Sequence, residues 1–112
     1  MKYAMLIHEK PGYVEALAED EQKAVFAEYR SLGEDPRARG GAQLQPVETA
    51  TTVRVQEGQT LTTDGPFADT KEVFVGYYVF EADNLDEAVE LAARIPAARL
   101  GGAVEVRPLV ER

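Results

Sequence analysis

The two residues best suited to chemistry in this 112-residue chain are a carboxylate at a forced turn and the chain's single histidine. Asp64 precedes Gly65-Pro66-Phe67, where a carboxyl group would act as a general acid or base if burial raised its pKa. Alternatively, Asp64 only accepts hydrogen bonds from its own turn. The ordinary pKa of a histidine lies near neutrality, and the alternative for His8 is a simply hydrogen-bonded or exposed ring. We take Asp64 and His8 as candidate catalytic residues.

Four further side chains are candidates for binding a ligand. Arg54 and Arg107 stand on the polar faces of alternating strands, and an arginine presents a planar fork that suits an anionic group. Internal pairing with a glutamate, or exposure to water, is their alternative. Phe67 follows the turn and is either a cleft wall or a core anchor. Tyr77 belongs to a strongly apolar strand, where it lines a cleft or packs with its hydroxyl satisfied.

Composition excludes several kinds of site. The absence of cysteine removes disulfides, thiol nucleophiles, iron–sulfur clusters and cysteine-based zinc sites, and one histidine cannot make a histidine-rich metal site. No glycine-rich nucleotide motif, P-loop, GxSxG or HExxH pattern occurs. We therefore predict no cofactor and no metal. The net charge of −8 repels nucleic-acid phosphates, so we expect no direct nucleic-acid partner.

Hydrophobicity along the chain is typical of a soluble globular protein. Hydrophobic residues make up 45% of the sequence, and the length suits one domain spanning residues 1–112. The amino-terminal apolar run is too short for a signal-peptide core and too interrupted for a membrane span. We expect a soluble cytoplasmic protein with no membrane partner.

Periodicity predicts the elements that must position these residues. Alternation predicts a first strand over 2–8 and five further strands, and helical spacing predicts two helices. Asn84 is the expected N-cap of the second helix, and Glu57-Gly58 is a two-residue hairpin signal. The predicted helices span 20–32 and 84–95, and the other strands span 42–47, 51–56, 59–63, 72–82 and 103–110.

The order of these elements predicts an α+β fold. With one hairpin set aside it is βαββαβ, the ferredoxin-like pattern of two helices on one face of an antiparallel sheet. The strand at 72–82 is apolar on both faces, with Val73 and Val75 grouped on one and Phe74 and Tyr78 on the other, so it should lie centrally. The face without helices then needs a cover, which a homodimer packing sheet against sheet would supply.

An ordered series of motifs resembles the DGPF branch of the YCII-related family. TTDGPFADTKE carries the DGPF motif, preceded by TATTVRVQEG and followed by VGYYVFEADNLDEAVELAARIPAA and VEVRPL. The resemblance covers most of the chain and implies a ferredoxin-like dimeric α+β barrel, an enzymatic role in a buried polar cleft, and genes found near extracytoplasmic-function sigma factors. Relatives with a proposed His–Asp pair carry the histidine in the first helix. Residues 20–32 contain none, so that pair does not carry over.

Two functions from different classes are consistent with these patterns. The first is an enzyme performing acid–base chemistry on a small molecule in a cleft at the sheet edge, such as an isomerase, lyase or hydrolase. Asp64 would move a proton, His8 would assist and Arg54 would hold an anionic group. The second is a non-catalytic dimeric module that binds a ligand or a protein, linked to transcriptional regulation through sigma factors. A scaffold without any ligand is the third interpretation.

Overall fold

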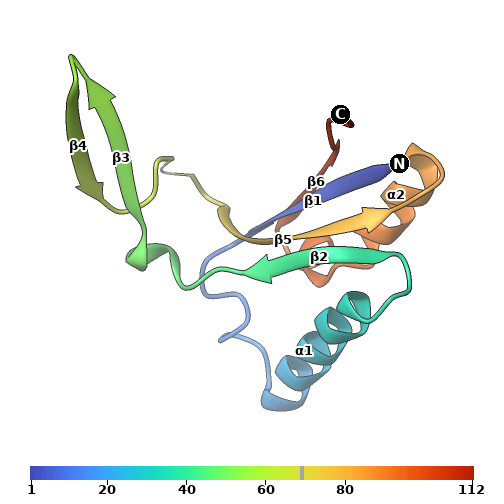
Figure 1. Ribbon diagram of the computed structural model, residues 1–112. Helices are drawn as coiled ribbons and strands as arrows, with labels where there is room; N and C mark the ends of the chain where they lie inside the picture. The colour runs from blue at the N-terminus through green and yellow to red at the C-terminus, as the bar shows by residue number, and fades with distance from the viewer. Residues whose placement is uncertain (69) are drawn as a thin grey trace.

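The chain folds into a four-stranded antiparallel sheet, two helices and a separate two-stranded hairpin (Figure 1). The computed structural model describes residues 1–68 and 70–112. The main sheet consists of β1 (Lys2–Glu9), β2 (Ala38–Gln43), β5 (Val73–Glu81) and β6 (Ala103–Pro108). The helices are α1 (Glu19–Gly33) and α2 (Leu85–Ala93), and the hairpin pairs β3 (Thr51–Gln56) with β4 (Gln59–Asp64). Two 3-10 turns, η1 (Val47–Thr49) and η2 (Pro96–Ala98), complete the described elements.

The main sheet has the strand order of a ferredoxin-like fold. Its order is β2-β5-β1-β6, so β1 and β5 are central and β2 and β6 form the edges. Both helices pack on one face of this sheet. The predicted α+β pattern, βαββαβ with one inserted hairpin, is therefore confirmed. Among the described residues no helix has the length and apolarity that a membrane span requires.

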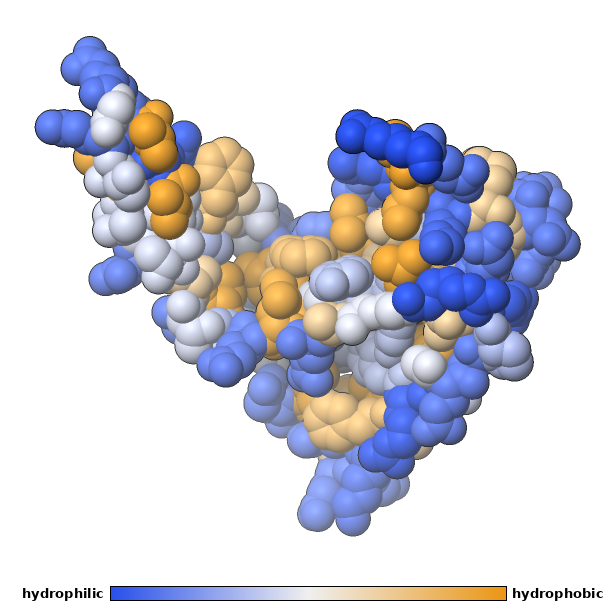
Figure 2. Space-filling view, in the orientation of Figure 1, coloured by the Kyte–Doolittle hydropathy of each residue, from blue (hydrophilic) through white to orange (hydrophobic). Residues whose placement is uncertain are grey.

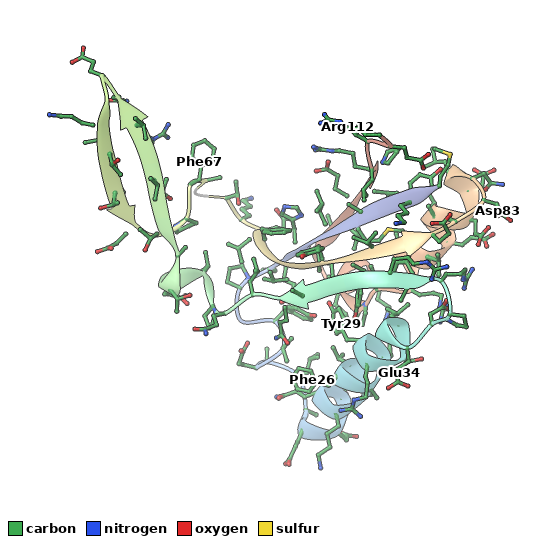
Figure 3. The ribbon with its side chains drawn as sticks, in the orientation of Figure 1. Phe26, Tyr29, Glu34, Phe67, Asp83 and Arg112 are labelled. Carbon is green, nitrogen blue, oxygen red and sulfur yellow. The ribbon has the colours of Figure 1, made fainter. Side chains whose placement is uncertain are left out.

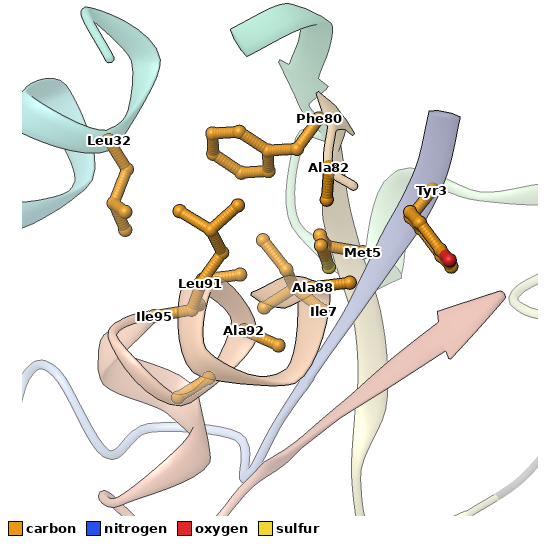
Figure 4. Close-up of a cluster of buried hydrophobic side chains, with 11 residues drawn as sticks. Tyr3, Met5, Ile7, Leu32, Phe80, Ala82, Ala88, Leu91, Ala92 and Ile95 are labelled. Atoms are coloured by element: carbon orange, nitrogen blue, oxygen red, sulfur yellow. The ribbon is translucent and has the colours of Figure 1, made fainter. Parts of the chain in front are cut away.

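A cluster of buried side chains between the helices and the sheet forms the core (Figure 4). Met5, Phe80, Leu91 and Ile95 are each at most 1% exposed, and they come from β1, β5, α2 and the segment just after α2. Burying one such side chain contributes about 1.5–3 kcal/mol. The alternation of the first strand produced this arrangement, because every second residue of β1 points at the helices.

The second helix begins at the residue that the sequence predicted. The Oδ1 atom of Asn84 accepts a hydrogen bond of 2.9 Å from the backbone N–H of Glu87. The side chain of Glu87 reaches back and accepts 3.1 Å from the backbone N–H of Asp83. These two bonds satisfy backbone donors that a helix start leaves without partners.

A β-bulge changes which residues of β5 face the helices. The pairing register shifts after Ile7, so that His8 pairs with Phe74 and Val75 has no partner in β1. Strict alternation grouped Phe74 with Tyr78, and that prediction is wrong. Phe74 instead stacks on His8, with ring centroids 5.5 Å apart, while Val75 packs against the core.

The second strand lies earlier in the chain than its apolar pattern predicted. The sequence predicts a strand over 42–47, but β2 spans Ala38–Gln43 and includes Gly40 and Gly41. Both glycines adopt positive φ, 151° and 154°, which favours glycine. A Cβ atom at Gly41 would lie 2.5 Å from the backbone oxygen of Tyr77, so only glycine lets this edge strand approach β5.

The hairpin β3–β4, residues 51–64, projects from the body of the molecule and is called the arm (Figure 1). Its two-residue turn has positive φ at Glu57 (50°) and Gly58 (77°), as the predicted hairpin signal requires. Val53 and Val55 on the arm are 59% and 66% exposed. The radius of gyration is 15.8 Å, against roughly 13 Å for a compact domain of this length. The arm is thus an extension without a packed core of its own.

An ion-pair network joins the end of α1 to the start of α2. The guanidinium of Arg37 donates 3.0 Å hydrogen bonds to each carboxylate oxygen of Asp35 and a 3.2 Å bond to Glu87. Arg94 lies 3.7 Å from the same aspartate, whose side chain is 10% exposed. The hydrogen bonds from Arg37 lower the pKa of Asp35 from 3.8 to about 2.

We predict that Asp35→Asn lowers the free energy of unfolding at neutral pH by about 2 kcal/mol, the range for hydrogen bonds to a charged group. Because the folded pKa of Asp35 is depressed, its contribution is fully present above pH 3.8 and is lost as the pH falls through about 2. Urea denaturation at several pH values should show the difference from wild type shrinking in acid. Asp20→Asn, an exposed substitution on α1, is the matched control. An equal loss in the control would contradict the prediction.

Candidate functional site

A cleft of about 900 Å³ lies between α1, the loop after β1 and the adjoining parts of β2 and β5. Phe26 and Tyr29 contribute to it from α1, and Tyr78 contributes from β5. Figure 3 shows Tyr29 between the helix and the sheet, with Phe26 nearer the start of the helix. A cleft of this size accommodates a small organic molecule.

Glu9, the last residue of β1, brings a carboxylate into this cleft. Its Oε1 atom accepts hydrogen bonds of 3.3 Å from the hydroxyl groups of Tyr13 and Tyr29. The strand ends there because a turn follows, with φ of 80° at Gly12 and a hydrogen bond from the Tyr13 N–H to the Lys10 carbonyl. The turn returns Tyr13 to the carboxylate four residues later, and α1 supplies the second tyrosine.

Burial raises the pKa of Glu9 above its ordinary value of 4.5, because the charged form loses hydration. Hydrogen bonds from Tyr29 and Tyr13 favour the carboxylate and oppose this shift in part. Burial also raises the pKa of both phenols, so they remain protonated donors at neutral pH. A partly buried carboxyl group with a raised pKa in a cleft is an arrangement suited to acid–base chemistry.

Tyr78 fixes the position of Tyr29 beside the carboxylate. The hydroxyl of Tyr78 donates a 2.7 Å hydrogen bond to the backbone oxygen of Tyr29. The two rings lie 6.5 Å apart at an angle of 22°. A Cβ atom at Gly41 would lie 3.2 Å from the Tyr78 ring, so the glycine in β2 also makes room for it. The edge strand, the central strand and the helix therefore position the phenol together.

The catalytic candidates from the sequence, Asp64 and His8, lie in different sheets. Asp64 is the exposed last residue of the arm, and no described side chain or backbone group hydrogen-bonds to its carboxylate. The next residue, Gly65, closes the base of the arm by donating 2.8 Å to the Ala50 carbonyl. His8 lies in the main sheet against Phe74. Neither Asp64 nor His8 lines the Glu9 cleft, and their joint role stays a prediction.

The four ligand-binding candidates are also distributed over the molecule. The Arg54 guanidinium lies 5.0 Å from the ring centroid of Phe67, which is 75% exposed beside the arm (Figure 3). Arg107 pairs with Glu105 on the exposed surface of β6, the alternative that the sequence left open. Tyr77, 37% exposed, borders the Glu9 cleft, but its side chain shares the face of Leu6 opposite the helices. A single chain therefore does not bring these four side chains together in one site.

Sequence reasoning missed the residues that the structure brings together. Glu9 belongs to a turn signal and Tyr29 to a helical apolar stripe, so each pattern had a local explanation. The hydrogen bond between them spans 20 residues of sequence. The usable signal was a carboxylate ending an apolar strand with Tyr13 four residues later. That signal alone does not indicate burial.

A metal centre is not apparent in the part of the chain that the structure describes. Groups of three or more His, Asp or Glu side chains placed to hold an ion do not occur there. The groups that meet Glu9 are phenols that donate hydrogen bonds. Glu9 is therefore held by hydrogen-bond donors and not by metal-ligating side chains.

This chain is similar to a known family model, to a relative in another organism and to a solved structure. A family model described as YCII-related domain matches residues 1–112. A protein of Rhizobium meliloti (strain 1021), described as uncharacterized, is 35% identical over 97% of this chain and 92% of its own length. A solved structure, 5-chloro-2-hydroxyhydroquinone dehydrochlorinase from Burkholderia phenoliruptrix AC1100 in complex with 2,5-dihydroxybenzoquinone, superposes with a TM-score of 0.55. It covers 100% of this chain and 96% of its own at 18% identity, which shows a shared fold.

We predict that Glu9→Gln stabilises the protein at neutral pH, by less than about 1 kcal/mol because solvent screens a partly buried group. The raised folded pKa means that wild type loses stability as the pH rises from 4.5 through that pKa. Glutamine carries no charge, and its Oε1 still accepts from both phenols. Thermal unfolding midpoints should match at about pH 4 and diverge toward pH 8. Glu21→Gln, exposed on α1, should show no such divergence, and a destabilised Glu9→Gln would contradict the burial argument.

Proposed function

Because the chain belongs to the YCII-related domain family, we propose that it is an enzyme using acid–base chemistry on a small molecule in the Glu9 cleft. The observation that carries this proposal is the partly buried Glu9 carboxyl, held by two phenols and with a raised pKa. The dehydrochlorinase supports it by analogy of fold alone, since that protein acts on a small ring compound.

Proton transfer is the step that this geometry favours. Tyr13 and Tyr29 both bond to Oε1 of Glu9, and within the described residues Oε2 makes no hydrogen bond. Oε2 is thus the oxygen that takes a proton from a ligand C–H or O–H group and later returns it to another atom. Both phenols stay neutral and hold the carboxylate in place through the cycle. Isomerisation fits this chemistry, because it moves a proton within one molecule and needs no co-reactant.

We also propose a homodimer that packs through the uncovered face, the face of the main sheet opposite the helices, which includes Leu6, His8, Phe74 and Val79. An apolar sheet face without helices requires another cover, and a two-fold pair is the commonest one. Figure 2 shows hydrophobic side chains on both sides of the space between the arm and the body. Because Asp64 and His8 lie in different sheets of one chain, their predicted joint role requires this dimer to bring Asp64 of one subunit to His8 of the other.

A non-catalytic binding module is the second candidate, favoured by the exposed apolar side chains of the arm, among them Val53, Val55 and Leu61. The net charge of −8 would favour a basic surface on a protein partner such as a transcription factor. Pull-down at low and high salt separates the two candidates, because such a partner is retained only at low salt. The cytoplasmic location expected from the sequence stays a prediction.

We predict that the protein accelerates exchange of the α-hydrogen of at least one class of small carbon acid for deuterium. The panel contains α-hydroxy ketones, α-amino ketones and α-keto acids, followed by proton NMR in heavy water. Glu9→Gln should lower the exchange rate by about 100-fold, the lower range for a general base. Glu21→Gln should retain the wild-type rate. Exchange that survives Glu9→Gln, or its absence with every class, would exclude Glu9 as the catalytic base.

We predict that wild type sediments as a dimer of the 12.3 kDa chain at about 10 μM, and that Val79→Lys converts it to monomer. A lysine at the centre of the uncovered face would place an unpaired charge in the interface. Val89→Lys introduces the same side chain on α2, where Val89 is 49% exposed, and should leave the dimer intact. Analytical ultracentrifugation gives the masses, and a monomeric wild type would refute the dimer.

A further inference from the structure

We propose that the Glu9 cleft binds an organic cation, a small molecule that carries an ammonium or similar charge next to an apolar part. The inference deepens the proposed function by naming the ligand class of the same site, and it rests on that function only for what happens after binding. It stands on the cavity, the charges that line it and the aromatic side chains in its walls.

The charged groups that line the cleft are mainly acidic. Glu9, Glu15 and Glu48 supply carboxylates, and Arg30 is the one guanidinium among the lining residues that the structure describes. Glu15 is close enough that its charge further disfavours ionisation of Glu9. An anion entering this space would meet like charges, whereas a cation would relieve their repulsion. The sign of the cleft therefore opposes the anionic ligand that Arg54 suggested.

The other cation near the phenols is already paired. Arg99 interacts with the Tyr13 and Tyr29 hydroxyl groups electrostatically, but its Nη2 atom donates a 2.8 Å hydrogen bond to Glu28. That pair carries no net charge and lies partly exposed to solvent. It leaves the acidic balance of the cleft unchanged.

Aromatic side chains form much of the wall around the carboxylate. Tyr13, Tyr29 and Tyr78 line the cleft together with Phe26, which is 50% exposed. The face of an aromatic ring attracts a cation lying within about 6 Å, an interaction strengthened by partial desolvation. Rings around one carboxylate thus suit a charged amine with an apolar substituent. A hydrophilic inorganic cation would find few ligands there.

Binding of a cation would also favour the deprotonated form of Glu9, which is the form that acts as a base. A positive charge beside Glu9 favours the ionised carboxylate and opposes the effect of burial. The cation and the proton on Glu9 therefore compete, and affinity rises with pH while Glu9 loses its proton. Glu15, Glu48 and Arg30 are the other charged groups that line the cleft. A ligand of this class would generate the form of Glu9 that abstracts a proton.

The test compares three probes built on one ring: benzyltrimethylammonium, benzyl alcohol and benzylsulfonate. Isothermal titration calorimetry should show benzyltrimethylammonium binding at least about tenfold more tightly than benzyl alcohol. Benzylsulfonate should show no saturable binding. Glu9→Gln should weaken the cation about tenfold without affecting the alcohol, and Glu21→Gln should change neither. Wild-type affinity for the cation should rise between pH 4.5 and 7.5 and stay flat in Glu9→Gln.

Three results would overturn the inference: no binding of any probe, sulfonate binding equal to the cation, or cation binding that Glu9→Gln leaves unchanged. Circular dichroism verifies that the variant is folded. The proposed catalytic function and the proposed ligand class can each fail without the other. Cation binding as expected with no hydrogen exchange in any carbon acid refutes catalysis and supports the ligand class. Exchange with α-keto acids and not α-amino ketones supports catalysis and refutes the ligand class.

Discussion

The packing of one apolar sheet face against two helices is the constraint on which the rest of the structure depends. Met5, Phe80, Leu91 and Ile95 are almost fully buried in that layer, and their burial supplies the main favourable free energy of folding. Because both helices pack on the same face, no described helix covers the opposite face within one chain. The same packing places α1 near the end of β1, where the Tyr29 hydroxyl donates a hydrogen bond to Glu9.

The candidate site follows from the way α1 meets the sheet. The last turn of α1 is anchored in the core by Leu32, which is 2% exposed, while Phe26 nearer the helix start is 50% exposed. The cleft lies along this less buried part of the helix. Burying the Glu9 carboxylate there costs folding free energy at neutral pH, which the core offsets. Such a cost is common at functional sites, where stability is lost for chemistry.

The arm shows the difference between a locally determined shape and a completed packing arrangement. Its turn is set by two residues with positive φ, and the Arg54–Phe67 contact lies beside it. A two-stranded hairpin alone is only marginally stable in water, because it buries little surface. Val53 and Val55 stay largely exposed in one chain. The uncovered face and the arm therefore share one property, apolar surface that a single chain leaves exposed, and the proposed homodimer would cover it.

The sequence by itself determined the elements whose causes are local. Alternation in β1, the Asn84 cap and the Glu57-Gly58 turn each depend on neighbouring residues. The order of these locally predicted elements gave the βαββαβ pattern. Tertiary structure alone decided the bulge that moved Phe74, the glycine edge strand at Gly40-Gly41 and the contact between Glu9 and Tyr29. These features depend on strand register, close backbone approach and burial. Each of these features arises where segments far apart in the chain come together, so no local sequence pattern predicts it.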